Sequence, residues 1–123
     1  DAYFHACLLG WGGAQLSDFD ATQLAAYRSA WRDPDTIRGM CNDYRATLIH
    51  DMADDNLDAG TRITCPTRIL YGAQGAMAQH YDVPATWAAK CATMTATAVP
   101  GGHFFPDTAP EDTAAALLDV LAN

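Results

Sequence analysis

The sequence lacks long apolar runs and has few basic residues. It contains 7 lysines and arginines against 15 aspartates and glutamates in 123 residues, which gives a formal net charge of −8. The basic residues are scattered, and an acidic chain is repelled by phosphate backbones and by anionic lipid. A membrane-spanning helix needs about 20 consecutive apolar residues, and no such run is present. The composition therefore argues against nucleic-acid and membrane partners and predicts one soluble globular domain.

Cysteines at metal-binding or disulfide-type spacings are also lacking. The four cysteines are far apart and form neither a CxxC pair nor a cluster with histidine. We therefore expect no zinc site, no other metal and no disulfide framework. Free cysteines are usually small buried apolar residues, and unpaired thiols are typical of a reducing cytoplasm, so we predict buried side chains and a cytoplasmic protein. The four positions are Cys7, Cys41, Cys65 and Cys91.

We expect no secretory leader, because no basic segment followed by an apolar segment opens the sequence. The first residue is Asp1 rather than methionine, and residues 2–9 already have a helical character. We therefore expect this chain to be part of a longer polypeptide.

Residues 1–62 have mainly helical periodicity. Asp33 and Pro34 supply an N-cap and a proline at the first helical position of a helix that should run to about Met52. Its apolar face consists of Ile37, Met40, Cys41, Tyr44 and Leu48. A helix before it has apolar residues at the same spacing: Leu24, Tyr27 and Trp31. Residues 10–18 are expected to form a glycine-containing loop.

After residue 62 the pattern alternates between strands and helices. Residues 67–71 and 94–99 are the expected strands. Pro84 falls in the first turn of the helix between them, and Thr108 with Glu111 forms a capping box for a final helix. Alternation of this kind predicts parallel pairing of the strands in an α/β fold. Two parallel strands do not make a complete sheet, so we expect further strands outside this sequence.

A glycine-rich segment with one histidine follows the second predicted strand. Ligands of open α/β sheets bind beyond the carboxyl ends of the strands. The segment Gly101-Gly102-His103 lies there, and the glycines allow a sharp turn. Imidazole exchanges protons near neutral pH, so His103 is a candidate general base. A lone loop histidine is also common as a surface or packing residue, and spacing alone leaves both alternatives open.

Two sets of motifs resemble a known family. Residues 100–104 (PGGHF), followed by Pro110, Glu111 and a closing helix, resemble the end of an α/β-hydrolase-fold protein. Residues 40–46 (MCNDYRA) and the acidic run 51–58 resemble the haloacetate (fluoroacetate) dehalogenases. Residues 63–66 (ITCP) and 70–72 (LYG) add to this resemblance. The resemblance covers nearly the whole chain, and residues 40–46 are its most specific part. It implies a helical lid segment over 1–62 and the C-terminal end of the hydrolase core over 63–123.

The resemblance also implies a chemistry. In such dehalogenases an aspartate displaces halide from the substrate carbon and forms an ester, and a histidine then activates the water that hydrolyses it. By this likeness His103 is the base, Tyr44 donates its hydroxyl to the departing halide, and Trp11 lies near the substrate entrance. Tyr44 could instead be an ordinary member of the apolar helix face, and Trp11 an anchor of the lid.

One departure from the hydrolase pattern concerns the acid of the catalytic triad. Many α/β hydrolases carry it as Gly-x-x-Asp after the strand that ends here at Tyr71. Residues 72–75 read GAQG instead, and Asp82 is only a weak substitute. The dehalogenase relatives place their acid after an earlier strand, which agrees with its absence here. The nucleophile is also expected outside these residues, so this chain holds one triad member.

The resulting interpretation is the C-terminal part of a dehalogenase that acts on a short 2-haloacid such as haloacetate, without metal or organic cofactor. Its partners would be the haloacid and the missing N-terminal polypeptide, and a homodimer remains open. One alternative is an epoxide hydrolase of the same fold, in which Tyr27 and Tyr44 would polarise the epoxide oxygen. Another is a non-enzymatic acidic interaction domain. His5, His50 and His80 are interpreted as structural or surface residues.

Overall fold

The computed structural model describes residues 1–121, apart from the side chains of Trp11 and Val120. The chain divides into two compact units, Asp1–Asp20 with Arg62–Asn123 and Ala21–Thr61. Among the described residues, no helix is long and apolar enough to cross a membrane.

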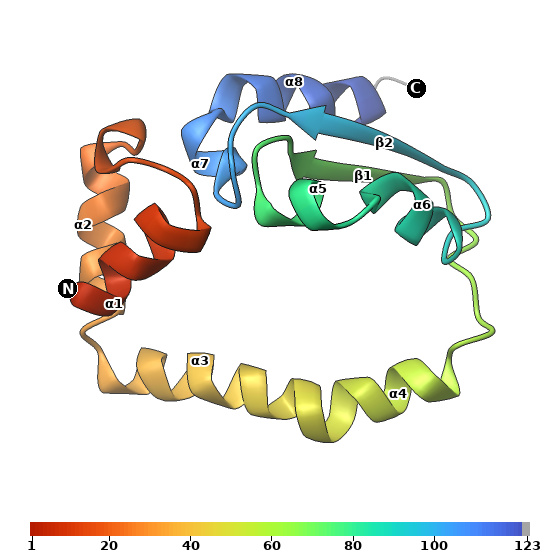
Figure 1. Cartoon of the computed structure of the whole chain (residues 1–123), viewed down its shortest axis with the longest axis horizontal. Coiled ribbons are helices and arrows are strands. Elements are labelled where there is room, and N and C mark those ends of the chain that lie inside the picture. The colour runs from red at the N-terminus through yellow and green to blue at the C-terminus, as the bar shows by residue number, and fades with distance from the viewer. Residues whose placement is uncertain (122–123) are drawn as a thin grey trace. The chain divides into compact units, whose positions relative to one another are not determined.

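A parallel pair of strands forms the centre of the first unit (Figure 1). Strand β1 is Thr67–Gly72 and strand β2 is Met94–Val99, in a register that sets Thr67 beside Met94 and Gly72 beside Val99. Both strands lie where the sequence predicts them. Their β-branched and aromatic residues favour extended backbone, and Pro66 and Pro100 stand just outside.

Helices cover both faces of this pair. The connection from β1 to β2 contains α5 (Ala76–His80) and α6 (Val83–Ala88), and β2 is followed by α7 (Phe105–Thr108) and α8 (Pro110–Leu121). The side chain of Arg68 reaches Thr97 on β2 and Asp119 on α8, with Nη2 3.0 Å from the Asp119 carboxylate. Because successive side chains of a strand point to opposite faces, Ile69 and Tyr71 face the other side, where α5 and α6 lie.

The N-terminal segment packs with this strand pair. It consists of α1 (Ala2–His5), the π-helical η1 (Ala6–Trp11) and the 3-10 turn η2 (Leu16–Asp18). The rings of Phe19 and Phe104 meet edge-on with centroids 5.9 Å apart, so the segment touches the loop after β2. Residues 1–20 therefore share a unit with the C-terminal half, although the sequence groups them with the helices up to residue 62. The assignment of lid and core at that residue stays a prediction.

The second unit is helical throughout its described elements. They are α2 (Ala21–Ala30), α3 (Pro34–Ala46), the π-helical η3 (Thr47–Asp51) and α4 (Met52–Leu57). The predicted N-cap is present, because the Asp33 carboxylate accepts a hydrogen bond of 3.0 Å from the backbone N–H of Asp35. The helical path continues to Leu57, beyond the predicted end near Met52.

The expectation that all four cysteines are buried is wrong for two of them. Cys7 and Cys91 are buried, whereas Cys41 and Cys65 are exposed, and all four are free thiols. Cys41 lies on α3, a helix with no buried residue, so its apolar neighbours do not cover it. Cys65 lies in a bend just before β1.

Candidate functional site

The loop after β2 presents His103 at the carboxyl end of the strand pair. Gly101 has a φ of +105°, a conformation that an L side chain rarely adopts, so the chain can turn here only because this residue is glycine. Gly102 is buried and His103 is exposed. The loop therefore carries the histidine out of the sheet at the edge where α/β folds bind ligands.

Three glycines let backbone segments meet closely around this loop. A Cβ atom on Gly72 would lie closer than 3.0 Å to the carbonyl oxygens of Gly101 and Gly102. A Cβ atom on Gly102 would be equally close to the carbonyl oxygen of Gly12. The same oxygen of Gly12 accepts the backbone N–H of His103 at 3.2 Å. The histidine loop is thus held between the end of β1 and the N-terminal segment.

Gln74 adds two hydrogen bonds to the loop. Its backbone N–H donates to the carbonyl oxygen of Gly101 at 2.9 Å, and its side-chain Oε1 accepts the backbone N–H of Gly101. The carbonyl oxygen of Gln74 accepts a hydrogen bond of 2.9 Å from Nε2 of Gln79 on α5. The turn after β1 is therefore bonded directly to the turn after β2.

A cavity of about 330 Å³ lies beside His103. Its walls come from the end of β1, the start of α5 and the histidine loop, and include Leu70, Tyr71, Ala76, Met77, His103 and Phe105. Mostly apolar walls with a few polar groups, here Tyr71 and His103, are typical of a small-molecule site. The imidazole also meets the ring of Phe104 edge-on, with centroids 4.9 Å apart.

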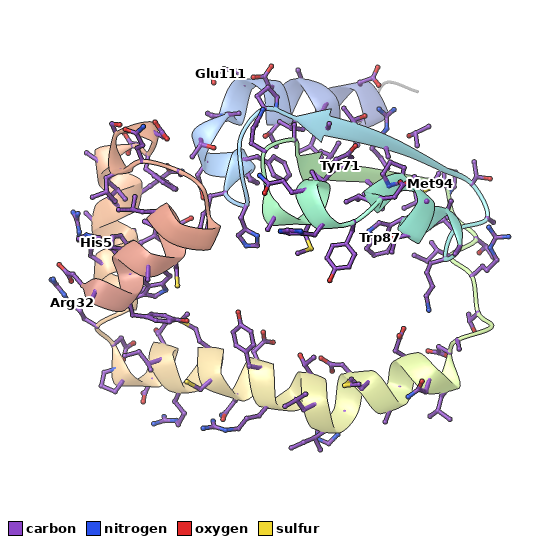
Figure 2. All side chains as sticks on the ribbon, viewed as in Figure 1. His5, Arg32, Tyr71, Trp87, Met94 and Glu111 are labelled. Atoms are coloured by element: carbon purple, nitrogen blue, oxygen red, sulfur yellow. The ribbon has the colours of Figure 1, made fainter. Side chains whose placement is uncertain are left out.

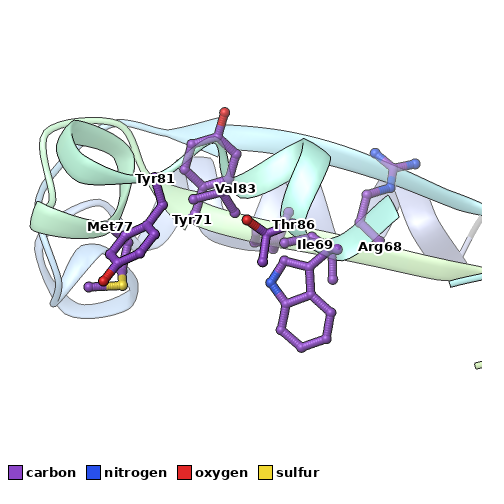
Figure 3. A pocket seen from close by; sticks show the side chains of 9 residues that line it. Arg68, Ile69, Tyr71, Met77, Tyr81, Val83 and Thr86 are labelled. Carbon is purple, nitrogen blue, oxygen red and sulfur yellow. The ribbon is translucent and has the colours of Figure 1, made fainter. Parts of the chain in front are cut away.

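A second groove, of about 580 Å³, follows β1 and is bordered by residues of α5 and α6. Met77 and Tyr81 lie at one of its ends and Arg68 at the other (Figure 3). Tyr71 enters from β1 and Trp87 from α6, as the view of all side chains also shows (Figure 2). This groove is lined mainly by apolar and aromatic side chains.

The other residues singled out from the sequence do not join this cavity within the first unit. Tyr44 belongs to α3 in the second unit and is 67% exposed. The side chain of Trp11 lies outside the described residues. The Asp82 carboxylate caps α6 by accepting the N–H of Ala85 at 2.9 Å, which gives it a structural role. No group of three or more histidine, cysteine or acidic residues in the described part could hold a metal ion.

Sequence reasoning identified the histidine but missed its backbone supports, Gly12 and Gln74. Gly12 lies far from His103 in the sequence, and glycines are common in loops, so no local signal pairs the two. Gln74 follows β1 at the strand end, which is the place to look for site residues. In the sequence its segment, residues 72–75, stands out only because it lacks the aspartate of the Gly-x-x-Asp pattern.

Known proteins show the same fold. No protein-family model matches the chain. A fluoroacetate dehalogenase from Burkholderia sp is 40% identical over all 123 residues, which span 40% of that protein. A crystal structure from Nostoc sp PCC 7120, described as an α/β hydrolase, aligns over 98% of this chain and 41% of its own, with a TM-score of 0.90 and 37% identity.

The chain has an α/β-hydrolase fold. It corresponds to the C-terminal part of that fold and resembles the haloacetate dehalogenases. Two further structures are each 28% identical to this chain. One is described as an acyltransferase from Salmonella enterica and has a TM-score of 0.89. The other is described as an epoxide hydrolase variant from Pseudomonas aeruginosa and has a TM-score of 0.84. They cover 98% of this chain and 40% and 41% of their own. These likenesses support a hydrolase.

Proposed function

We propose that this chain is the C-terminal part of a hydrolytic dehalogenase that cleaves the carbon–halogen bond of a short 2-haloacid such as haloacetate. The observation that carries the proposal is the 40% identity to a fluoroacetate dehalogenase along the entire chain. The exposed His103 beside a cavity at the end of a parallel strand supports it. The cavity is small and mostly apolar, which suits a compact substrate.

In the proposed reaction His103 acts after halide has left. An aspartate outside this chain attacks the halogen-bearing carbon, the carbon–halogen bond breaks, and an ester remains. His103 then takes a proton from water, and the water oxygen attacks the ester carbonyl carbon. The bond from that carbon to the bridging ester oxygen breaks. This oxygen came from the aspartate carboxylate, stays on the substrate carbon and receives the proton, while the oxygen from water remains on the aspartate. A 2-hydroxyacid leaves, and the aspartate is regenerated.

Two further roles belong to this proposal. The hydroxyl of Tyr44 would donate a hydrogen bond to the departing halide, where negative charge develops in the transition state. Trp11 would border the substrate entrance. Tyr44 suits the role chemically because its ring is 67% exposed on α3 rather than enclosed by its own unit.

The partner proposed for β1 is the rest of the same polypeptide, since the chain spans only 40% of its dehalogenase relative. At the start of β1 the N–H of Thr67 donates to the carbonyl oxygen of Thr93, just before β2, and after β1 the N–H of Ala73 donates to that of Val99. Alternate residues of a strand direct their N–H and C=O groups to opposite edges, so those of Arg68 and Leu70 point away from β2. No further strand pairs there among the described residues. The apolar groove of Figure 3 runs along these residues and would receive packing from the same polypeptide.

An epoxide hydrolase is the second candidate, favoured by the 28% identity to the Pseudomonas aeruginosa protein of that description. Such a reaction would use two tyrosine hydroxyls on the epoxide oxygen, from Tyr27 and Tyr44. The ring of Tyr27 stacks on that of Trp31 with centroids 6.4 Å apart, and its hydroxyl would have to converge with that of Tyr44 on one substrate.

The test uses the complete protein that contains this chain. It is incubated with fluoroacetate, with chloroacetate and with a small epoxide such as styrene oxide, and halide and diol are measured. The proposal predicts halide release from at least one haloacetate and its loss in His103→Ala. Diol formation without halide release would support the epoxide hydrolase instead, and neither product would contradict both.

A further inference from the structure

The contacts around the histidine loop assign a specific task to one residue, Gln74. It bonds to both backbone groups of Gly101, accepting the N–H with its side-chain Oε1 and donating its own N–H to the carbonyl oxygen at 2.9 Å. Gly101 is two residues before His103. Its φ of +105° belongs to a region where glycine has several accessible conformations, so the loop needs contacts that select one.

Gln74 is itself held in place from two sides. The turn that contains it is closed by a hydrogen bond of 3.1 Å from the N–H of Gly75 to the carbonyl oxygen of Gly72. On α5, Nε2 of Gln79 donates to the carbonyl oxygen of Gln74 at 2.9 Å. The side chain of Gln74 therefore extends from a fixed backbone, so its hydrogen bond also fixes the position of Gly101.

The opposite side of the loop has one comparable anchor. The N–H of His103 donates to the carbonyl oxygen of Gly12 at 3.2 Å. Gln74 holds the backbone at Gly101, and Gly12 holds it at His103. The backbone is therefore fixed on both sides of Gly102. A general base must lie within hydrogen-bond reach of the water it activates, and a displacement of about 1 Å can cost on the order of 100-fold in rate.

We propose that Gln74 is a positioning residue for His103, acting through its side-chain oxygen on the N–H of Gly101. This inference rests on the proposed function, in which His103 activates water for ester hydrolysis. Gln74 occupies the turn where many α/β hydrolases carry an acid, but here its amide oxygen is bonded to the loop backbone. It touches neither the substrate nor the imidazole in this role.

The proposal predicts which kinetic constant changes. Removing the oxygen in Gln74→Ala should slow only the hydrolysis of the ester, because the base is not used earlier. We expect kcat to fall by about 10-fold while kcat/KM, which reports the steps up to halide displacement, changes by less than about 2-fold. Mass spectrometry of the enzyme during turnover should show more ester than in the wild type.

Two matched variants of the complete protein separate this role from a general effect. Gln74→Glu keeps an acceptor oxygen on a side chain of the same length, so it should restore kcat to within about 3-fold of the wild type. Gln79→Ala removes the hydrogen bond to the carbonyl of Gln74 but leaves both bonds to Gly101, so it should lower kcat by clearly less than Gln74→Ala does. Failure of the rescue in Gln74→Glu would overturn the proposal.

A second measurement does not depend on activity. Amide hydrogen exchange by NMR should show the Gly101 N–H exchanging at least about 10-fold faster in Gln74→Ala, with no change in Gln74→Glu and a smaller increase in Gln79→Ala. Faster exchange along β1 and β2 as well would mean a loss of global stability and would overturn the positioning role. So would unchanged exchange at Gly101, or equal losses in kcat and kcat/KM.

These results also distinguish the inference from the proposed function. If the wild-type protein releases no halide from any haloacetate, the proposed function fails. The exchange data at Gly101 then decide by themselves whether Gln74 holds the loop, and the kinetic comparison applies to whichever hydrolysis the protein catalyses. Halide release with unchanged exchange and unchanged kcat in Gln74→Ala would leave the function standing and contradict only the positioning role.

Discussion

At the scale of single residues, the space beside Gly72 sets the position of the histidine loop. The end of β1 approaches the backbone of Gly101 and Gly102 so closely that a single methyl group would collide with their carbonyl oxygens. Backbone atoms cannot give way as a flexible side chain can. Gly72 therefore determines how closely the ends of β1 and β2 approach each other. This distance in turn sets the shape of the cavity beside His103.

Gly72→Ala should displace the loop and destabilise the protein by about 1–3 kcal/mol, the usual cost of adding a group to a close-packed site. Gly39→Ala is the matched control, because nothing lies within 4 Å of its added methyl group on α3. In a helix interior that change should stabilise by about 0.5–1 kcal/mol. Urea unfolding of the complete proteins measures both. Equal stability of the two variants would show that the approach at Gly72 is looser than described.

Tyr44→Phe tests the halide donor. Loss of one donor to developing charge should slow halide release in a single turnover by about 10-fold or more. Tyr81→Phe is the control, since Tyr81 is 61% exposed and is not among the residues that line the cavity beside His103. A wild-type rate in Tyr44→Phe would leave Tyr44 as an ordinary member of its helix face.

At the scale of elements, the long helical path from α3 to α4 begins with a strong local signal. Asp33 accepts the N–H of Asp35 at 3.0 Å and the hydroxyl of Thr36 at 3.2 Å, and Pro34 fits the first turn because it needs no hydrogen-bond donor there. The path passes through the π-helical η3 before α4. No residue of α3, η3 or α4 is buried, so the cap carries an unusual share of the stability of this path.

Asp33→Ala should therefore cost about 0.5–2 kcal/mol, and Asp33→Asn should cost far less because the amide oxygen still caps. Hydrogen exchange of the amides of residues 35–38 is the direct measurement. Faster exchange in both variants to the same degree would mean that charge, rather than the cap, holds this turn.

The elements also show what could be predicted from the sequence. Both strands and the cap at Asp33 follow local rules of propensity and turn chemistry, and the structure confirms them. The short α5 was missed because a helix of five residues has no readable periodicity. His103 could be identified as a candidate from its place after a strand. The contacts of Gly12 and Gln74 with its loop join distant positions, and such pairing depends on the tertiary fold.

At the scale of the whole molecule, the chain leaves much apolar surface uncovered within each unit. Trp87 is 40% and Leu118 64% exposed, and within residues 1–121 no further strand pairs with the outer edges of β1 and β2. A parallel sheet is normally buried on both faces and contains more than two strands. Apolar burial contributes about 25 cal/mol per Å², and an intact domain has a net stability of only about 5–15 kcal/mol, so losing part of a shared core is costly.

We therefore expect the 123-residue chain, expressed alone, to aggregate or to lack cooperative packing, and to show no dehalogenase activity. Thermal unfolding followed by near-ultraviolet circular dichroism measures this, with the complete protein as the control. A cooperative transition of the purified, monomeric chain would show that it folds as a free-standing domain.

We propose that His103 activates water after an ester has formed. Mass spectrometry of the His103→Ala variant of the complete protein tests this role most directly. After treatment with a haloacetate, the variant should release one equivalent of halide and retain the carboxymethyl group as a covalent adduct. His80→Ala is the control and should turn over without an adduct. If the His103→Ala protein stays unmodified, or turns over as fast as the wild type, His103 is not the base that hydrolyses the ester.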